Sequence, residues 1–155
     1  MTRAIVGIDP GASGALAALC GDALEVWDMP THDIKGKKRL DLHRLNDMVR
    51  GIAGLYEPRL AVIEDVHSMP KQGVASSFAF GFAAAAAQAF VVAYAMPMRL
   101  VPPSGWKRLM GLSADKDESR RKASQLFPRF ASLWSRSKDD GRAEAVLLAY
   151  YGSRL

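Results

Sequence analysis

The sequence has little cysteine and little histidine. Cys20 is the single cysteine among 155 residues, which excludes an intrachain disulfide and a zinc site built from several cysteines. The three histidines, His32, His43 and His67, share no metal-like spacing, so we assign no histidine ligand. The first residues also lack the basic start, long apolar run and small-residue cleavage site of a secretory signal. We therefore expect a reducing, cytosolic setting.

Long apolar runs are also scarce, and the sequence shows no internal repeat and no low-complexity linker. The longest apolar run, residues 78–98, contains Gln88 and is mostly alanine. Alanine makes a poor transmembrane span, so we predict a buried helix and no membrane association. The length suits one domain with a real core, and we predict a single domain over residues 1–155.

Charge is distributed unevenly along the chain. The formal net charge is +5, which favours an anionic partner without specifying one. Much of the positive charge lies in residues 35–39 and 116–129. By contrast, five acids lie in apolar or turn-like settings: Asp9, Glu64, Asp139, Asp140 and Glu144. A protein that cuts DNA combines basic flanks with an acidic centre of this kind.

The first of these acids ends an apolar run and precedes a glycine-rich turn. Residues 4–8 predict a buried strand, and Pro10 and Gly11 must end it, so the Asp9 carboxylate lies where the strand emerges. Gly11 and Gly14 permit close backbone approach, which suits a phosphate oxygen or a water beside the acid. An ordinary hairpin turn with a solvated aspartate explains these residues alone equally well.

The rest of the chain predicts an α/β fold. Strands are expected at residues 4–8, 15–19, 23–29, 60–66 and 97–101, and helices at 41–56, 74–94, 102–110, 116–127 and 139–151. The segments 30–38 and 128–137 are expected to be an exposed loop and an irregular stretch. A helix followed by a buried strand favours parallel pairing with the first strand, which places Glu64 beside Asp9.

The last helix carries two acids on its apolar stripe. Asp140 and Glu144 are four residues apart, in line with Leu147, Leu148 and Tyr151. Like charges at this spacing disfavour a helix by about 0.2–0.5 kcal/mol, and partial burial adds to that cost. A bound cation would offset both the repulsion between the acids and the cost of burying them. Each acid taken alone is also explained as a turn former, an ion pair or a cap.

Together these acids predict a metal site. Up to four carboxylates, from Asp9, Glu64, Asp140 and Glu144, converge on one point, with Asp139 as a rival to Asp140. Oxygen ligands of this kind select hard cations, Mg²⁺ or Mn²⁺. Two such ions can promote in-line attack of water on a phosphodiester without any nucleophilic side chain.

These motifs also resemble a known family. Strand-Asp-Pro-Gly at residues 5–11, Ala-Val-Ile-Glu at 61–64 and Asp-x-x-x-Glu-Ala-x-Leu-Leu-Ala at 140–149 look like the RuvC-type Holliday junction resolvases of the RNase H-like (integrase) superfamily. The resemblance spans essentially the whole chain. It implies a three-layer fold with a five-stranded mixed sheet of order 3-2-1-4-5. It also implies a homodimeric, Mg²⁺-dependent endodeoxyribonuclease that nicks two opposing strands of branched, four-way DNA.

The resemblance assigns roles residue by residue. Asp9, Glu64, Asp140 and Glu144 would be the catalytic acids and metal ligands, and Lys107 and Lys116 would lie near the scissile phosphate. The residues that would contact DNA are His67, Met69, Lys71, Gln72, Ser76, Phe78, Lys107, Lys116, Arg120 and Arg121. Phe78 and Phe82, one turn apart, are possible anchors of a dimer interface.

Two departures from the family pattern matter. The helical acids of the bacterial enzymes are usually three residues apart, whereas here Gly141 stands three before Glu144. The bacterial enzymes also place an aromatic residue three after the strand acid, where this chain has His67. These differences look more like phage or organellar branches and put a branch-migration motor in doubt. The expected location is the cytoplasm of a bacterial or phage-infected cell, or an organelle.

Two other function classes are compatible with parts of the sequence. Asp-x-Gly-x-x-Gly at residues 9–14 also fits a phosphate-binding lobe of the actin or sugar-kinase type, but enclosing ATP needs two such lobes and this chain has the length for one. The other class is a catalytically silent junction-binding protein of the same fold. Such a protein would tolerate loss of the acids, all of which are present.

Overall fold

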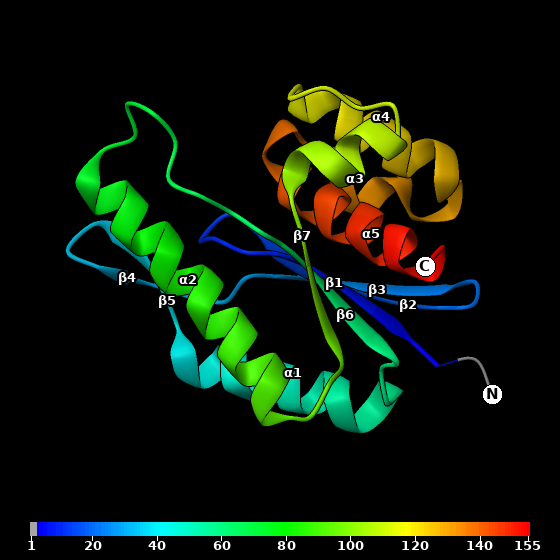
Figure 1. Cartoon of the computed structure of the whole chain (residues 1–155), viewed down its shortest axis with the longest axis horizontal. Helices are drawn as coiled ribbons and strands as arrows, with labels where there is room; N and C mark the ends of the chain where they lie inside the picture. The colour runs from blue at the N-terminus through cyan, green and yellow to red at the C-terminus, as the bar shows by residue number, and fades with distance from the viewer. Residues whose placement is uncertain (1–2) are drawn as a thin grey trace.

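The computed structural model describes residues 3–155 and is built around a five-stranded sheet (Figure 1). The strands are β1 (Ile5–Asp9), β2 (Ala15–Cys20), β3 (Ala23–Asp28), β6 (Leu60–Glu64) and β7 (Met98–Val101), in the order β3-β2-β1-β6-β7. This mixed α/β sheet was predicted from the sequence. The strand numbers differ from the expected 3-2-1-4-5 because two further strands intervene in the chain.

The pairing of β1 places the two strand acids at one edge of the sheet. β1 is antiparallel to β2 and parallel to β6, with Ile8 opposite Ile63. Parallel strands end on the same side, so Asp9 and Glu64 both emerge there. β7 continues the parallel half of the sheet, with Val101 opposite Glu64.

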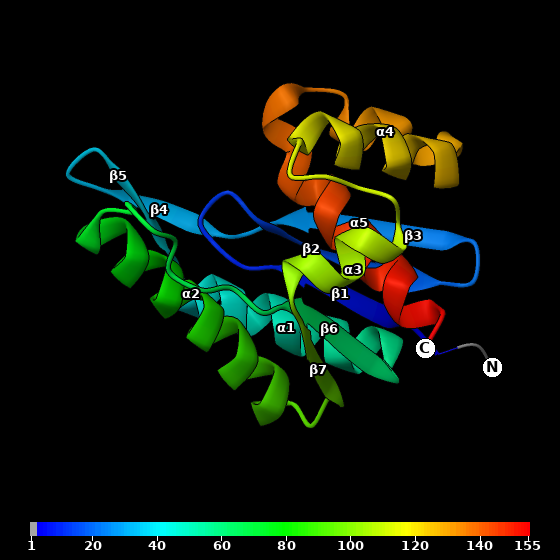
Figure 2. The same ribbon diagram turned by 45° about the horizontal axis from the view of Figure 1, so that its top comes forward.

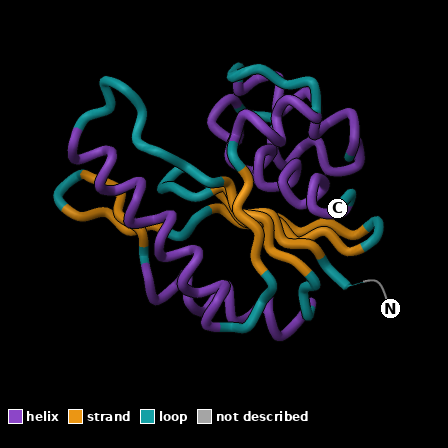
Figure 3. Tube along the Cα trace, in the orientation of Figure 1, coloured by secondary structure: helices purple, strands orange, loops and turns teal. Residues whose placement is uncertain are grey.

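Helices cover both faces of the sheet and make three layers (Figures 2 and 3). On one face α1 (Leu42–Tyr56) and α2 (Val74–Ala93) enclose a core that contains Val6, Ile8, Leu45 and Val49. On the other face lie α3 (Pro103–Leu109), α4 (Lys116–Leu126) and α5 (Asp140–Ser153). Their core contains Trp106, Trp134 and most of α5, which is buried along nearly its whole length.

The segment 30–38 is not the exposed loop that the sequence indicated. It forms most of a hairpin of β4 (Thr31–Ile34) and β5 (Lys37–Leu40), which makes a separate two-stranded sheet. Lys35 and Gly36 form its turn, and both have positive φ, at 52° and 75°. Two successive positive φ values match the twist of a tight hairpin. Figure 1 shows the hairpin projecting away from the main sheet, alongside the first part of α2.

The prediction of a buried helix at residues 78–98 is wrong for most of α2. The buried side chains of α2 are Ala83, Ala84, Ala87 and Val91. By contrast, Phe78 is 73% exposed and Val92 is 62% exposed. α2 is also, among the described helices, long and apolar enough to cross a membrane by length and composition, a property shared by many core helices. An apolar helix with this much exposed surface is a candidate for contact with another molecule.

The stretch 128–137 is more regular than predicted. It contains the 3₁₀ helix Pro128–Trp134, and a second 3₁₀ turn, Ser137–Asp139, leads directly into α5. Trp134 is buried, and its indole Nε1 donates a hydrogen bond to Ser124 Oγ at 2.9 Å. These turns therefore fix α4 against the start of α5, the helix that carries Asp140 and Glu144.

Candidate metal centre

Side-chain alternation directs the strand acids toward α5. Along β1, Val6 and Ile8 face α1 and α2, whereas Ile5 packs in the core around α5. Asp9 has the same parity as Ile5, so its carboxylate points to the α5 side. On β6, Val62 also belongs to the α5 core, and Glu64 is two residues further along. Both acids therefore leave the sheet edge on the same face.

Two glycines allow α5 to approach closely. A Cβ atom on Gly7 would overlap the Ala145 carbonyl oxygen, and one on Gly141 would overlap the Ser13 carbonyl oxygen. A Cβ on Gly141 would also lie 3.3 Å from Asp9 Oδ2. The position three residues before Glu144 therefore has no room for a side chain in this backbone. This crowding explains why an acid is absent there.

The close approach brings three carboxylates together. Asp9, Glu64 and Glu144 each offer an oxygen, and these oxygens lie within 4.8 Å of one another. Glu64 and Glu144 are buried, and Asp9 is partly buried. The donor set consists of carboxylate oxygens alone, which fits a hard divalent cation such as Mg²⁺ or Mn²⁺.

The electrostatics of the cluster favour a cation. Burial, and then the neighbouring Glu144, Glu64 and Asp140 carboxylates, hold the pKa of Asp9 well above its usual value. The pKa of Glu64 is also raised, chiefly by burial and by Glu144. Four carboxylates face the ammonium groups of Lys107 and Lys116, so two negative charges remain when all these groups are ionised. A divalent cation would neutralise that remainder.

Neutral and cationic donors hold the two glutamates from outside the cluster. Trp106, fully buried in α3, donates from Nε1 to Glu64 Oε2 at 2.9 Å. Lys107 Nζ lies 2.9 Å from Glu144 Oε1, and Ser119 Oγ lies 3.3 Å from the same oxygen. The sequence analysis did not identify Trp106 or Ser119 as a partner of these acids. No local spacing links Trp106 to Glu64, because the two residues are 42 positions apart.

The two aspartates at the start of α5 have different partners. Asp140 Oδ2 lies 3.0 Å from Lys116 Nζ, close enough to the cluster to raise the pKa of Asp9 but outside the group of three. Asp139 is buried, and Arg136 holds both of its oxygens, at 3.0 and 2.8 Å. Of the two, Asp140 is therefore the one that lies beside the carboxylate cluster.

The residues predicted to contact DNA lie mainly in one exposed segment. His67, Met69, Lys71, Gln72, Ser76 and Phe78 occupy the loop after β6 and the first turns of α2. Gln72 orders this loop by accepting a hydrogen bond from the Met69 amide and donating one to Ser76 Oγ. Met69 is 68% exposed and belongs to neither of the two hydrophobic cores.

The two predicted arginine contacts differ in availability. Arg120 Nη2 lies 2.7 Å from Asp117, and Arg120 Nη1 donates to the Ser135 carbonyl at 2.9 Å. Both Nη groups are therefore engaged within the protein, whereas the buried Nε has no hydrogen-bond partner among residues 3–155. Arg121 is exposed and lies 3.9 Å from Asp115, a distance that leaves its guanidinium accessible.

Sequence comparisons alone do not place this chain. A scan against protein-family models found no match, and a search of curated protein sequences also found none. Comparison of the fold with solved structures gave clear matches. Thermus thermophilus RuvC, solved in complex with a Holliday junction substrate, has a TM-score of 0.64 at 15% identity, over 98% of this chain and 95% of that chain.

The chain has the RuvC-type resolvase fold. The yeast mitochondrial Holliday junction resolvase Ydc2 matches with a TM-score of 0.53 at 13% identity, over 99% of this chain and 80% of that chain. The fowlpox virus resolvase, in complex with junction DNA, matches with a TM-score of 0.53 at 17% identity, over 96% and 99% of the two chains. The RuvC-type, RNase H-like architecture predicted from the sequence is confirmed at the level of the fold.

Proposed function

We propose that this protein is a metal-dependent endodeoxyribonuclease that resolves four-way DNA junctions by paired nicks. The observation that carries the proposal is the convergence of Asp9, Glu64 and Glu144 at the edge of a RuvC-type sheet. Two of the solved proteins with this fold, T. thermophilus RuvC and fowlpox virus resolvase, are complexed with Holliday junctions. Fold alone does not fix activity, so the acid cluster is the stronger argument.

The acids would hold the metal, and the lysines would act on the phosphate. Asp9, Glu64 and Glu144, with Asp140 beside them, would hold two Mg²⁺ or Mn²⁺ ions. Such a pair, when bound, supplies an activated water and stabilises the leaving oxygen. Lys107 and Lys116 hold ammonium groups beside the acids, where they can stabilise negative charge that develops on the phosphate.

Paired nicking requires two active centres, and we propose a homodimer for this reason. The exposed apolar face of α2, with Val74, Phe78, Ala85 and Val92 in one row, provides a surface for a second copy. Ala85, in the middle of the row, is small and lets two helices approach closely. We do not propose a branch-migration motor as a partner.

The direct test is cleavage of a labelled four-way junction in Mg²⁺, with linear duplex as the comparison substrate and Asp9→Asn as the inactive variant. We expect symmetric nicks in the junction from the wild-type protein and none from the variant. A wild-type protein that binds the junction but leaves it intact at every Mg²⁺ and Mn²⁺ concentration would be a silent binding protein. Turnover of ATP without DNA cleavage would instead support the phosphate-binding lobe.

A further inference from the structure

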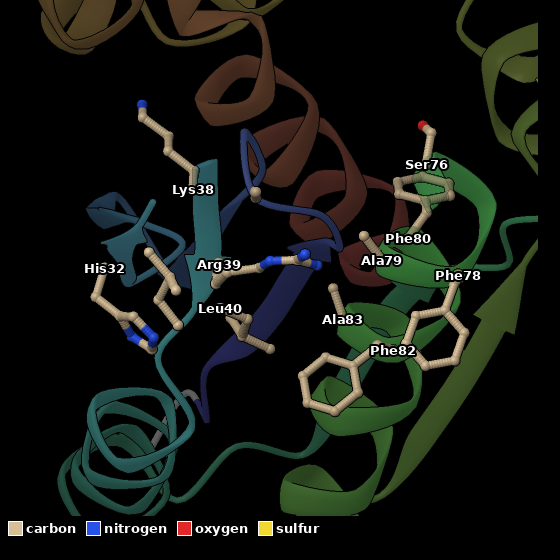
Figure 4. Close-up of a pocket in the computed structure, with 12 residues that line it drawn as sticks. His32, Lys38, Arg39, Leu40, Ser76, Phe78, Ala79, Phe80, Phe82 and Ala83 are labelled. Atoms are coloured by element: carbon tan, nitrogen blue, oxygen red, sulfur yellow. The ribbon is translucent and has the colours of Figure 1, made fainter. Parts of the chain in front are cut away.

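A groove lies between the β4–β5 hairpin and the first half of α2 (Figure 4). Its volume is about 420 Å³. One wall carries Phe80, Phe82 and Ala83 of α2, and the opposite wall carries Arg39 and Leu40 of β5. The groove is thus apolar along α2 and cationic along the hairpin.

The hairpin carries a cluster of exposed cations. Lys35, Lys37, Lys38 and Arg39 are exposed, and none forms an ion pair with any of residues 3–155. Figure 4 shows Arg39 extending across the groove toward α2, whereas Lys38 points away from α2. Four positive charges lie within five residues, and Asp33, opposite Lys38 in the strand register, is the one acid among residues 31–40. The hairpin therefore has a net positive charge that favours an anion from outside the chain.

The groove adjoins the turn that follows Asp9. Ala12 of this turn lines the groove, and a Cβ atom on Gly11 would lie only 2.9 Å from Phe80 Cε2. Figure 4 shows the Phe82 ring on the side of α2 nearer Arg39 and Leu40, and Phe78 farther from the hairpin. Phe82 and Phe80 therefore line the space between the hairpin and the turn that follows Asp9.

We propose that this groove binds an unpaired segment of the DNA substrate, with a base against Phe80 and Phe82 and a backbone phosphate on Arg39. A further phosphate would contact Lys38, where the DNA strand leaves the groove. Aromatic faces beside a cationic track are the combination that binds single-stranded nucleic acid. Duplex DNA cannot use the phenylalanines, because its base faces are already stacked. The apolar surface of a second copy would leave the four cations without counter-charges. This inference rests on the proposed function, since it takes DNA as the substrate.

The first experiment measures binding of a single-stranded oligothymidylate that carries one 2-aminopurine to the full chain. Lys38→Ala/Arg39→Ala should lower the affinity about tenfold or more and reduce the slope of log K against log salt by about 1.4, or about 0.7 per lost phosphate contact. The matched control is Arg3→Ala/Arg59→Ala, which removes two charges from a hollow at the other end of β6. Its affinity should change less than about twofold. Equal losses in both double variants would overturn the proposal.

The second experiment separates base stacking from charge. Phe82→Leu keeps an apolar side chain but removes the aromatic face, so it should weaken the quenching of 2-aminopurine and lower the affinity about fivefold, with an unchanged salt slope. Sedimentation without DNA identifies the competing occupant. If Phe82→Leu changes the oligomeric state while single-strand binding stays at the wild-type level, a second copy fills the groove and the proposal is wrong.

Junction cleavage by the same proteins distinguishes the two proposals. If the wild type cuts the junction and Lys38→Ala/Arg39→Ala binds single strands as tightly as the wild type, the groove assignment fails and the nuclease function stands. If the wild type does not cut, but the double variant selectively loses single-strand binding, the groove assignment stands and the nuclease function fails.

Discussion

Asp9 lies between other carboxylates, and this position controls its ionisation. Its pKa is raised by burial and by Glu144, Glu64 and Asp140. In the unfolded chain an aspartate ionises near pH 3.9. As the pH rises from there to the raised folded pKa, the folded state therefore holds more protons than the unfolded state, and stability falls. Above both pKa values, repulsion between the ionised carboxylates lowers the stability of the metal-free folded protein to its full extent.

Asp9→Asn should therefore stabilise the metal-free protein and abolish its response to metal. At pH 7.5 we expect a higher Tm than wild type without metal, because one of the repelling charges is gone. Added Mg²⁺ should raise the wild-type Tm through preferential binding to the folded state but leave the variant unchanged. Cleavage should fall by at least about 100-fold, the upper end of losses seen for residues that only support metal ligands. Thermal melts with and without Mg²⁺ check the first two outcomes, and a variant that is less stable than wild type without metal would contradict the electrostatic reasoning.

Trp106 should act as a positioning residue for Glu64. Its indole fixes one carboxylate oxygen and so determines which way the other oxygen faces. Trp106→Phe keeps an aromatic ring in the core but removes the donor. We expect the Mg²⁺ concentration for half-maximal cleavage to rise about 10–100-fold, as for other supporting partners of metal ligands. Metal titrations of cleavage at saturating junction give this value.

Trp134→Phe is the matched control. Trp134 is equally buried, and its Nε1 also donates one hydrogen bond, but to Ser124. The missing hydrogen bond should cost Trp134→Phe about 0.5–1.5 kcal/mol of stability, and Trp106→Phe, whose acceptor is a carboxylate, about 1.5–3 kcal/mol. Only Trp106→Phe should change the metal dependence. Equal metal requirements in the two variants would reduce Trp106 to a packing residue.

At the scale of elements, the start of α5 separates a structural acid from a site acid. Arg136 lowers the pKa of Asp139 through paired hydrogen bonds, whereas Asp140 lies beside Lys116 and Asp9. The lowered folded pKa of Asp139 contributes stability that is present above the unfolded pKa and is lost as the pH falls through the folded pKa.

Asp139→Asn should lose about 1.5–3 kcal/mol at pH 7, the range for hydrogen bonds to charged groups, while its Mg²⁺ requirement stays at the wild-type value. The difference in stability from wild type should shrink as the pH falls below about 4, where the unfolded Asp139 becomes protonated. Asp140→Asn should show the reverse, with near-wild-type stability and impaired cleavage. Urea unfolding at pH 7 and pH 3, beside cleavage assays, compares the two. If Asp139→Asn is the variant that loses metal-dependent cleavage, the assignment of the two aspartates is inverted.

The periodic elements were predictable because local burial determines them. β1 and β6 are short apolar runs that end at an acid, and α5 follows a helical stripe, so the convergence of Asp9, Glu64 and Glu144 could be predicted. The β4–β5 hairpin was missed because it lies outside the main sheet and buries little beyond Leu40. Its turn uses Lys35 at positive φ, where asparagine or glycine would have been the recognisable signal.

Contacts that depend on tertiary packing could not be predicted in this way. The hydrogen bond from Trp106 to Glu64 joins a helix to a distant strand, and no spacing in the sequence reports it. In the sequence, Gly141 is visible only as a departure from the family's spacing of the helical acids. Its meaning depends on the distance between α5 and the turn after β1, which only the folded chain defines.

At the scale of the whole molecule, α2 stands out because one of its faces exposes a row of apolar side chains. Four residues of its inner face are buried, whereas the row from Val74 through Phe78 and Ala85 to Val92 faces outward. A symmetric pair of such helices would cover both rows at once, because a two-fold interface joins the same patch on each subunit. The two metal centres would then act on one junction.

Ala85→Glu places a charge in the middle of this row and should dissociate the dimer. An unpaired buried charge costs several kcal/mol, so the dissociation constant should rise more than about 100-fold. On a cruciform plasmid the wild type should give linear product, whereas the variant should release nicked circles because its two cuts are no longer coupled. Leu55→Glu is the control, since Leu55 is 74% exposed on α1 and the change adds the same charge outside the α2 row. Sedimentation equilibrium with and without junction measures the association. A wild type that stays monomeric on the junction, or an Ala85→Glu variant that stays dimeric and still linearises the plasmid, would show that α2 is not the dimer interface.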